Sequence, residues 1–263
     1  MASLGASSAG RRTFRGGGRD SRVTPGATAR PAWAGAVEAT VVLAFAALWA
    51  VLAARLAGVL DGATAWLLPG VVGAGVLAAD FASGLVHWFC DSVFEEDTTL
   101  VGPLVILPFR EHHRDPLAMT RHAFLEITGN ICLALVPALG LGLWLLPAPL
   151  AGAVGVQLVH ALLLATTGAA FWTNQLHKWA HTPAPPAAVA WLQRRRLVLA
   201  PGAHGRHHRP GGRAYCVLTG WMNAPLDRCR FFPRLEAAMA ALGFRWFTRA
   251  EWPGTAAPDG TGR

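Results

Sequence analysis

Charged residues are scarce in this sequence. Asp, Glu, Lys and Arg together make up 14% of its 263 residues, whereas hydrophobic residues make up 53%. Soluble domains carry about 25% charged residues, so the deficit indicates a membrane protein. The net charge of +8 does not indicate nucleic-acid binding, because the basic residues flank apolar segments and the sequence contains no recognisable nucleic-acid module.

The motifs of several enzyme classes are also missing. The four cysteines, Cys90, Cys132, Cys216 and Cys229, form no Cys-x-x-Cys pair, which argues against a zinc ribbon or a disulfide framework and predicts free thiols. There is no Gly-x-Ser-x-Gly nucleophile elbow and no His-Glu-x-x-His motif of a zinc protease. No Gly-x-Gly-x-x-Gly motif follows a strand pattern, so we expect no bound flavin or nicotinamide.

Long apolar segments are present, and four of them reach the roughly 20 residues that a membrane helix needs. They cover about 34–59, 66–89, 127–146 and 150–176. Residues 1–33 carry six Arg and one Asp, which predicts a disordered basic tail. The membrane domain is expected over 34–232. Residues 233–263 are predicted to form an amphipathic helix and a tail, the helix lying on the membrane interface or packing over the site.

The distribution of positive charge predicts the orientation of these spans. The N-terminal tail is basic, and the region after residue 176 has thirteen Lys or Arg against four Asp or Glu. Because basic flanks favour the cytoplasm, both termini are predicted to be cytoplasmic. The sequence therefore predicts an all-α integral membrane protein, with four transmembrane helices and a cytoplasmic helical cap.

Nine of the ten histidines fall on this cytoplasmic side. They are His87, His112, His113, His122, His177, His181, His204, His207 and His208. His160 lies inside the fourth span, and we expect a structural role for it. Nine imidazoles at one membrane face exceed the four ligands of a single zinc site, so the clustering predicts a two-metal centre.

The spacing of the histidines supports metal ligation. His177 and His181 stand at i and i+4, which places them on one helical face, and Asn174 lies three residues earlier on the same stripe. His87 and Asp91 have the same spacing. We predict that the nine histidines bind metal, with Asp91 among the catalytic residues.

Three polar residues are predicted to orient these ligands. They are Asp80, Glu126 and Asn174, each on a helical stripe with a histidine. An acid inside a span is costly and indicates a functional role. Asp80 is therefore expected to accept the second N–H of a ligand histidine, and Glu126 stands four residues after His122.

Imidazole-rich ligation with open coordination positions suits iron that activates O2. The residues alone also leave zinc and manganese open. A metal transporter is disfavoured, because its histidines would line the spans rather than stop at one surface. A non-catalytic metal-binding membrane protein, for transport or sensing, stays open as an alternative.

Five stretches over about 75–232 resemble the plasmanylethanolamine desaturases, the Kua-type lipid desaturase family. They are "AADFASGLVHWFCD", "PFREHHRDPLAMTRHAFLE", "FWTNQLHKWAHT", "HGRHHRP" and "YCVLTGWMNAPLD". The resemblance implies a membrane enzyme with two irons held by the nine histidines. It implies that the enzyme converts the sn-1 alkyl ether of an ether phospholipid to the vinyl ether of a plasmalogen. The partners expected with this chemistry are O2 and an external electron donor, a cytochrome b-type protein or a ferredoxin.

The sequence departs from the family pattern at a few positions. Ala123 stands where an acid is common, and Arg196 and Gly211 stand where other members carry histidines. The related plastid branch, which desaturates an acyl chain of phosphatidylglycerol, typically lacks the Arg-Glu-His-His form and the histidine at position 122. The "FREHH" and "TRH" stretches therefore favour the ether-lipid branch. An acyl-lipid desaturase or hydroxylase of the same di-iron chemistry remains the alternative.

Two further groups of residues are assigned from their position near the predicted cytoplasmic face. Arg194, Arg195 and Arg196 are expected to dock an acidic carrier or anionic lipid headgroups, or simply to form a positive-inside flank. Tryptophans near the ends of the spans, Trp88 and Trp172 among them, are expected to be interface anchors.

Overall fold

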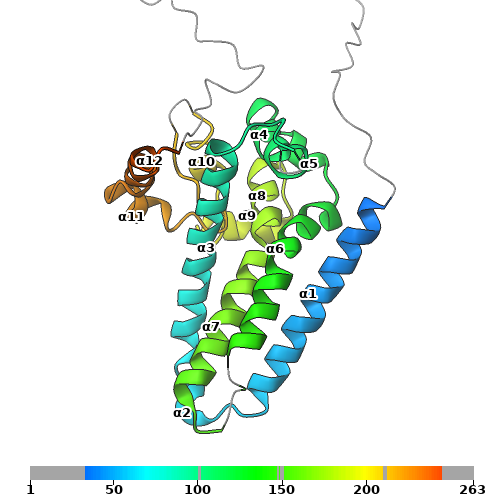
Figure 1. Ribbon diagram of the computed structural model, residues 1–263, viewed down its shortest axis with the longest axis vertical. Coiled ribbons are helices and arrows are strands. Elements are labelled where there is room, and N and C mark those ends of the chain that lie inside the picture. The colour runs from blue at the N-terminus through cyan, green and yellow to red at the C-terminus, as the bar shows by residue number, and fades with distance from the viewer. Residues whose placement is uncertain (1–32, 100–101, 147, 149–150, 210–211, 245–263) are drawn as a thin grey trace, which may run out of the picture. The chain divides into compact units, whose positions relative to one another are not determined.

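The computed structural model describes residues 33–99, 102–146, 148, 151–209 and 212–244. Over these residues the regular structure is helical. Four long helices run side by side and form a bundle (Figure 1). They are α1 (Ala34–Ala57), α3 (Leu68–Ser92), α6 (Phe124–Leu145) and α7 (Val154–Phe171). All four, with α7 continued to His181, are long and apolar enough to cross a membrane, so the four predicted spans are confirmed as helices.

The ends of the spans differ from their predicted positions, because hydropathy does not mark where a helix stops. α3 continues past the apolar residues through Asp91 to Ser92. The fourth span passes at Trp172 directly into α8 (Thr173–His181). The first link contains a short helix, α2 (Gly62–Ala65), which begins where the side chain of Asp61 accepts the backbone N–H of Thr64 at 2.9 Å.

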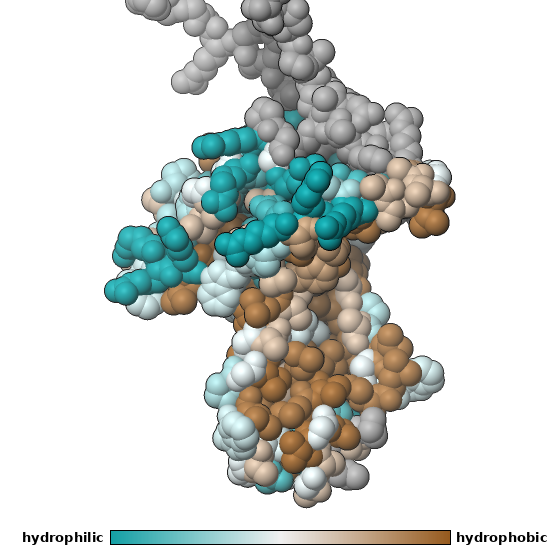
Figure 2. All heavy atoms as spheres, turned by 90° about the vertical axis from the view of Figure 1, so that its left-hand side faces the viewer, coloured by the Kyte–Doolittle hydropathy of each residue, from teal (hydrophilic) through white to brown (hydrophobic). Residues whose placement is uncertain are grey.

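The bundle is held together by pairs of helices, α1 on α6 and α3 on α7. Large apolar side chains such as Leu52 and Leu139 fill the space between them. Gly75 lies so close to α7 that an added Cβ would be 2.5 Å from the Cβ of Ala165, an approach that only a small residue permits. Figure 2 shows hydrophobic residues over the lower part of the molecule and hydrophilic residues over the other end.

Short helices gather at that hydrophilic end (Figure 1) and form the helical cap that was predicted from the sequence. Besides α8 they are α4 (Leu107–Arg114), α5 (Ala118–Arg121), α9 (Ala187–Arg194), α10 (Pro201–His204), α11 (Asn223–Arg228) and α12 (Phe231–Ala241), with a π-helical turn at Gly102–Ile106. The cap therefore consists of short elements that pack on the ends of α3, α6 and α8.

The predicted terminal segments lie largely outside the described residues. The predicted disordered tail, 1–33, has only Trp33 within them. The predicted amphipathic helix corresponds to α12, in which Phe232 packs with Trp88 and Tyr215 and Glu236 accepts the indole N–H of Trp88 at 3.2 Å. The prediction that Trp88 is an interface anchor is wrong, because this packing buries it, whereas Trp172 is 46% exposed.

Candidate metal centre

Seven of the nine predicted histidine ligands form two groups in the cap, and His112 belongs to both. The first group is His87, His112, His113 and His207, and the second is His112, His181, His204 and His208. Within each group the ligand nitrogens lie within 4.8 Å of one another. An eighth histidine, His177, adjoins the second group, since its Nε2 lies 2.9 Å from Nε2 of His204. The groups are assembled from α3, α4, α8 and the segment around α10, as the predicted cap requires.

Asp91 supplies a carboxylate to the first group. Its Oδ2 lies 3.2 Å from Nε2 of His113, 3.5 Å from Nε2 of His207 and 3.8 Å from Nε2 of His87. The side chain is only 3% exposed. A carboxylate among imidazoles in a dry site is a donor set that suits iron, and the extension of α3 beyond its apolar residues is what brings Asp91 there.

Nε2 of His204 in the second group has more nitrogen neighbours at hydrogen-bond distance than it can bond to. Nε2 of His204 lies 2.8 Å from Nε2 of His181 and 2.9 Å from Nε2 of both His177 and His208. A ring nitrogen either donates one hydrogen or offers one lone pair, so these three contacts cannot all be hydrogen bonds. Two nitrogens bound at right angles to one metal ion, about 2.1 Å from each, would lie about 3.0 Å apart. The geometry therefore fits a shared cation.

The buried histidines are held in the form that binds metal. The pKa values of His112 and His204 lie well below the ordinary histidine value, because burial disfavours the charged ring and neighbouring histidines add to the effect. Nε2 of His87 and Nε2 of His112 are buried without a hydrogen-bond partner among the described residues. A bound metal would satisfy these nitrogens, which are otherwise costly to bury.

Two backbone carbonyls orient ligands of the first group. Nδ1 of His87 donates to the carbonyl oxygen of Tyr215 at 3.2 Å, and Nδ1 of His207 donates to that of Arg213 at 2.6 Å. With the hydrogen on Nδ1, each ring presents the lone pair of Nε2 to the metal group. These two positions could not be predicted from the sequence, because a backbone carbonyl group carries no side-chain signature.

The direct hydrogen bond predicted between Asp80 and a ligand histidine is wrong. The carboxylate of Asp80 does not accept the second N–H of a ligand histidine, since His87 donates that hydrogen to Tyr215. Oδ1 of Asp80 instead accepts the backbone N–H groups of residues 218–220, and Oδ2 accepts that of Met222. The segment that supplies these donors lies 138 to 142 residues later in the chain, so helical spacing could not reveal it.

His122 is in neither histidine group. Its Nδ1 lies 2.8 Å from Oε1 of Glu126, which confirms the expected contact between this histidine and Glu126. The recorded hydrogen bond of Asn174 does not go to His177, with which it shares a helical stripe. Its amide instead donates to the carbonyl of Ile127 at 2.8 Å and links α8 to α6. His160 is buried, and its Nδ1 lies 2.8 Å from the carbonyl oxygen of Val156 in its own helix, in keeping with a structural role.

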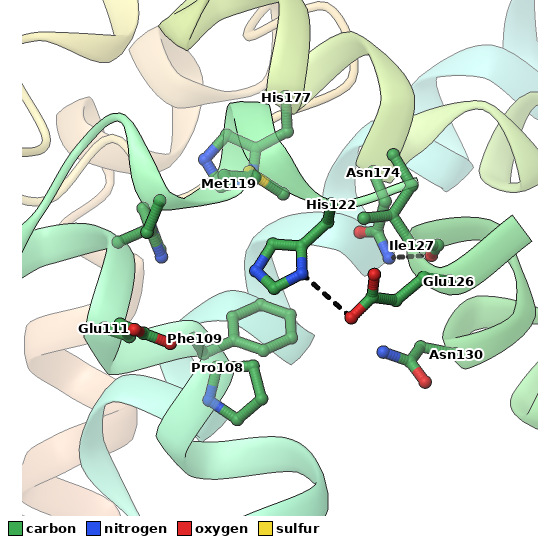
Figure 3. Close-up of a pocket in the computed structure, with 12 residues that line it drawn as sticks. Pro108, Phe109, Glu111, Met119, His122, Glu126, Ile127, Asn130, Asn174 and His177 are labelled. Atoms are coloured by element: carbon green, nitrogen blue, oxygen red, sulfur yellow. Dashed lines mark hydrogen bonds and ion pairs between the residues drawn. The ribbon is translucent and has the colours of Figure 1, made fainter. Parts of the chain in front are cut away.

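A pocket lies between His122 and the metal groups, and Figure 3 shows the His122 ring within it, beside Phe109. The apolar part of its lining is Pro108, Phe109, Ala118, Met119 and Ile127. The polar part is Glu111, His112, His122, Glu126, Asn130, Asn174 and His177. Because His112 and His177 belong to the histidine cluster, a molecule in this pocket would lie next to the metal centre. Phe109 and Met119 were not predicted to belong to the site, although both lie within the stretch that carries His112, His113 and His122.

Comparison with known proteins agrees with this site. The family model of the lipid desaturase domain matches residues 76–245, which include all ten histidines of the chain. The chain therefore belongs to the lipid desaturase family, and it is a desaturase, an oxidoreductase that acts on lipid in a membrane. No solved structure matches it.

Three curated relatives of the chain are lipid desaturases by name. The chain is 43% identical over 206 residues to a plasmanylethanolamine desaturase of Myxococcus xanthus, which covers 76% of this chain and 70% of the relative. It is 39% identical over 182 residues to plasmanylethanolamine desaturase 1 of Mus musculus, covering 68% and 67%. It is 33% identical over 175 residues to the chloroplastic fatty acid desaturase 4 of Arabidopsis thaliana, covering 65% and 51%. The resemblance seen in the sequence is thus confirmed.

Proposed function

We propose that the chain is an O2-dependent desaturase that introduces the vinyl-ether double bond into the sn-1 alkyl chain of an ether phospholipid. The observation that carries this proposal is the pair of four-histidine groups sharing His112, which also lines the pocket. The names of the relatives from Myxococcus xanthus and Mus musculus support the ether-lipid substrate.

Two iron ions would occupy the two histidine groups. His87, His113, His207 and Asp91 would hold one ion, and His181, His204 and His208 the other, with His112 between them and His177 beside the second. When bound, iron would supply the activation of O2 that removal of hydrogen from an unactivated C–H bond requires. His122 is not within either group, so we assign it to the pocket rather than to the metals.

The overall reaction fixes which partners the enzyme needs. The substrate loses two hydrogens, and therefore two electrons, from adjacent carbons beside the ether oxygen. Reduction of O2 to two water molecules takes four electrons, so an external donor must supply the other two. We propose a cytochrome b-type protein or a ferredoxin as the donor. The exposed Arg194, Arg195 and Arg196 would attract an acidic carrier or anionic headgroups.

The residues of the chain would bind and orient the lipid. Phe109, Met119 and the other apolar residues of the pocket would enclose the part of the alkyl chain that reacts and keep water away from it. The His122–Glu126 pair would contact the polar part of the lipid next to the ether oxygen. The carbonyls of Tyr215 and Arg213 would keep His87 and His207 in the tautomer that binds metal.

We further propose that both termini and the metal site face the cytoplasm. The excess of basic residues after residue 176, thirteen against four, supports this orientation. The hydrophilic residues at the cap end of the molecule agree with it (Figure 2).

The test is lipid analysis of a host that makes ether phospholipids but no plasmalogens. Expression of the wild-type chain should produce acid-labile vinyl ethers, and expression of His112→Ala should not. His160→Gln is the matched control, because it replaces a histidine outside the metal centre and should preserve the product. Ether lipids that stay unchanged while the wild-type chain is present in the membrane would contradict the proposal.

A second candidate is an acyl-lipid desaturase or hydroxylase with the same di-iron chemistry. The likeness to the fatty acid desaturase 4 of Arabidopsis thaliana supports it. The same lipid analysis separates the two candidates, because this one predicts changed acyl chains and no vinyl ether. A non-catalytic metal-binding role is not retained, since the chain belongs to a family of desaturases.

A further inference from the structure

The segment of residues 213–222, here called the strap, lies against α3 around Asp80 and Ser83 and forms neither a helix nor a strand. Its residues from Ala214 to Thr219 are buried. Buried backbone groups need hydrogen-bond partners, and no regular ladder supplies them here. The hydrogen-bond partners of the strap's backbone therefore indicate what holds this segment in place.

Asp80 is the main partner of the strap. The carboxylate is fully buried, and it accepts backbone N–H groups from Leu218 at 3.2 Å, Thr219 at 2.8 Å, Gly220 at 3.0 Å and Met222 at 2.9 Å. A carboxylate that accepts several N–H groups makes strong, charge-assisted hydrogen bonds. Four such bonds to one side chain explain how an acid is tolerated within an apolar helix.

The next turn of α3 fixes the position of the strap along the helix. The hydroxyl of Ser83 accepts the N–H of Val217 at 3.0 Å. Gly84 lies so close that an added Cβ would be 2.5 Å from Sγ of Cys216 and 3.3 Å from its backbone nitrogen. The side chain of Asn223 bonds to both the N–H and the carbonyl of Cys216, at 2.9 and 3.0 Å. The strap therefore has one register on α3.

The beginning of the strap carries the two carbonyls that orient metal ligands. Tyr215 accepts from His87 on the same face of α3, and Arg213 accepts from His207. Asp80, Ser83, Gly84 and His87 follow one another at helical spacing, so anchoring the strap at the first three places its carbonyls over the fourth. The two carbonyls that accept from ligand rings thus belong to a segment that bonds to a carboxylate two turns before His87 on α3.

We infer that Asp80 is a positioning residue for the first metal group, acting through the strap on His87 and His207. This inference rests on the proposed function, because it assumes that the group binds a metal ion. Loss of the anchor lets the two carbonyls move and the two rings rotate. The expected result is weaker iron binding by about 10–100-fold, the usual cost of losing a partner that orients a ligand.

The test is anaerobic titration of the purified full chain in detergent with Fe(II), followed by iron analysis. The variants are Asp80→Asn, which keeps one carboxyl-type oxygen, Asp80→Ala, which removes both, and Gly84→Ala, which pushes the strap away from α3. Gly73→Ala is the matched control, because it makes the same change in the same helix where nothing lies within 4 Å. Circular dichroism, gel filtration and thermal unfolding report the fold of each protein.

The inference predicts two tightly bound irons in the wild type and in Gly73→Ala. In the folded variants Asp80→Asn, Gly84→Ala and Asp80→Ala, at least one iron should bind more weakly, and Asp80→Ala should be weaker than Asp80→Asn. Variants that melt earlier but bind two irons with wild-type affinity would show that Asp80 only stabilises the fold, and would overturn the inference. If the larger changes prevent folding, Ser83→Ala decides between these outcomes, since it removes a single hydroxyl group from the anchor.

Failure of the inference is distinguishable from failure of the proposed function. A wild-type chain that binds no iron contradicts the proposed metal centre itself. A wild-type chain that binds two irons, together with folded variants that do the same, contradicts only the role of Asp80.

Discussion

Oδ2 of Asp91 and Nε2 of His113 lie 3.2 Å apart, although the two residues come from α3 and α4. The carboxylate also lies within 3.8 Å of His87 and His207. Its negative charge would offset part of the charge of a metal ion held there, and its oxygen would serve as a ligand. Asp91 is therefore a suitable residue for a test, because replacing it with Asn removes the negative charge of the first group with little change in size.

Asp91→Asn should therefore weaken iron binding at the first group by at least about tenfold and abolish vinyl-ether formation. Iron per chain and lipid analysis measure the two effects. Asp115→Asn is the matched control, because Asp115 is a half-exposed acid near the same histidines in the chain and pairs with Arg121 at 2.7 Å. An Asp91→Asn variant that binds two irons and keeps full activity would show that Asp91 has no role in metal binding or catalysis.

His122→Ala should keep both irons and lose substrate affinity, because the structure places His122 in the pocket and outside the two groups. We expect KM for the lipid to rise by about tenfold or more through the lost polar contact. Glu126→Gln should raise KM in the same direction, since Glu126 orients the ring. His112→Ala serves as the comparison and should lose iron. Loss of iron from a folded His122→Ala variant would show that His122 is a metal ligand, as the sequence predicts.

Filling the pocket should block the substrate without disturbing the metals. Met119→Trp adds a large ring to the lining of the pocket and should reduce vinyl-ether formation at least about tenfold, a cost expected when a reacting group is displaced by an ångström. Leu117→Trp places the same ring at a nearby exposed position, where the leucine is 48% exposed, and should leave activity unchanged. Equal activity of both variants would mean that the lipid binds elsewhere.

Labelling of a cysteine can test the proposed orientation. Burial determines which thiol reacts, and the orientation determines the side of the membrane from which it is labelled. Cys229 is exposed in the cap, whereas the other three cysteines are buried, and burial raises the pKa of the Cys216 thiol, which keeps it protonated and unreactive. A membrane-impermeant maleimide should therefore label Cys229 in inside-out vesicles and not in intact cells. Cys229→Ser should remove the label. Labelling of Cys229 in intact cells would reverse the proposed orientation.

The parts of the site that could be predicted from sequence are those encoded within one helix. Hydropathy located the four spans, and spacing paired His177 with His181 and His87 with Asp91. The parts that could not be predicted depend on contacts between segments distant in the chain. Asp80 finds its partners about 140 residues later, and the carbonyls of Tyr215 and Arg213 have no side-chain signature. His122 shares the histidine-rich stretch with His112 and His113, yet the turn between α5 and α6 directs it into the pocket.

Metal analysis of the purified wild-type chain is the decisive test of the proposed two-iron centre. We expect two irons per chain, bound by a protein that consumes O2 when given a lipid substrate and an electron donor. We also expect that His112→Ala loses both irons or binds them much more weakly, because His112 belongs to both groups. One zinc ion per chain, with no consumption of O2, would contradict the proposed centre.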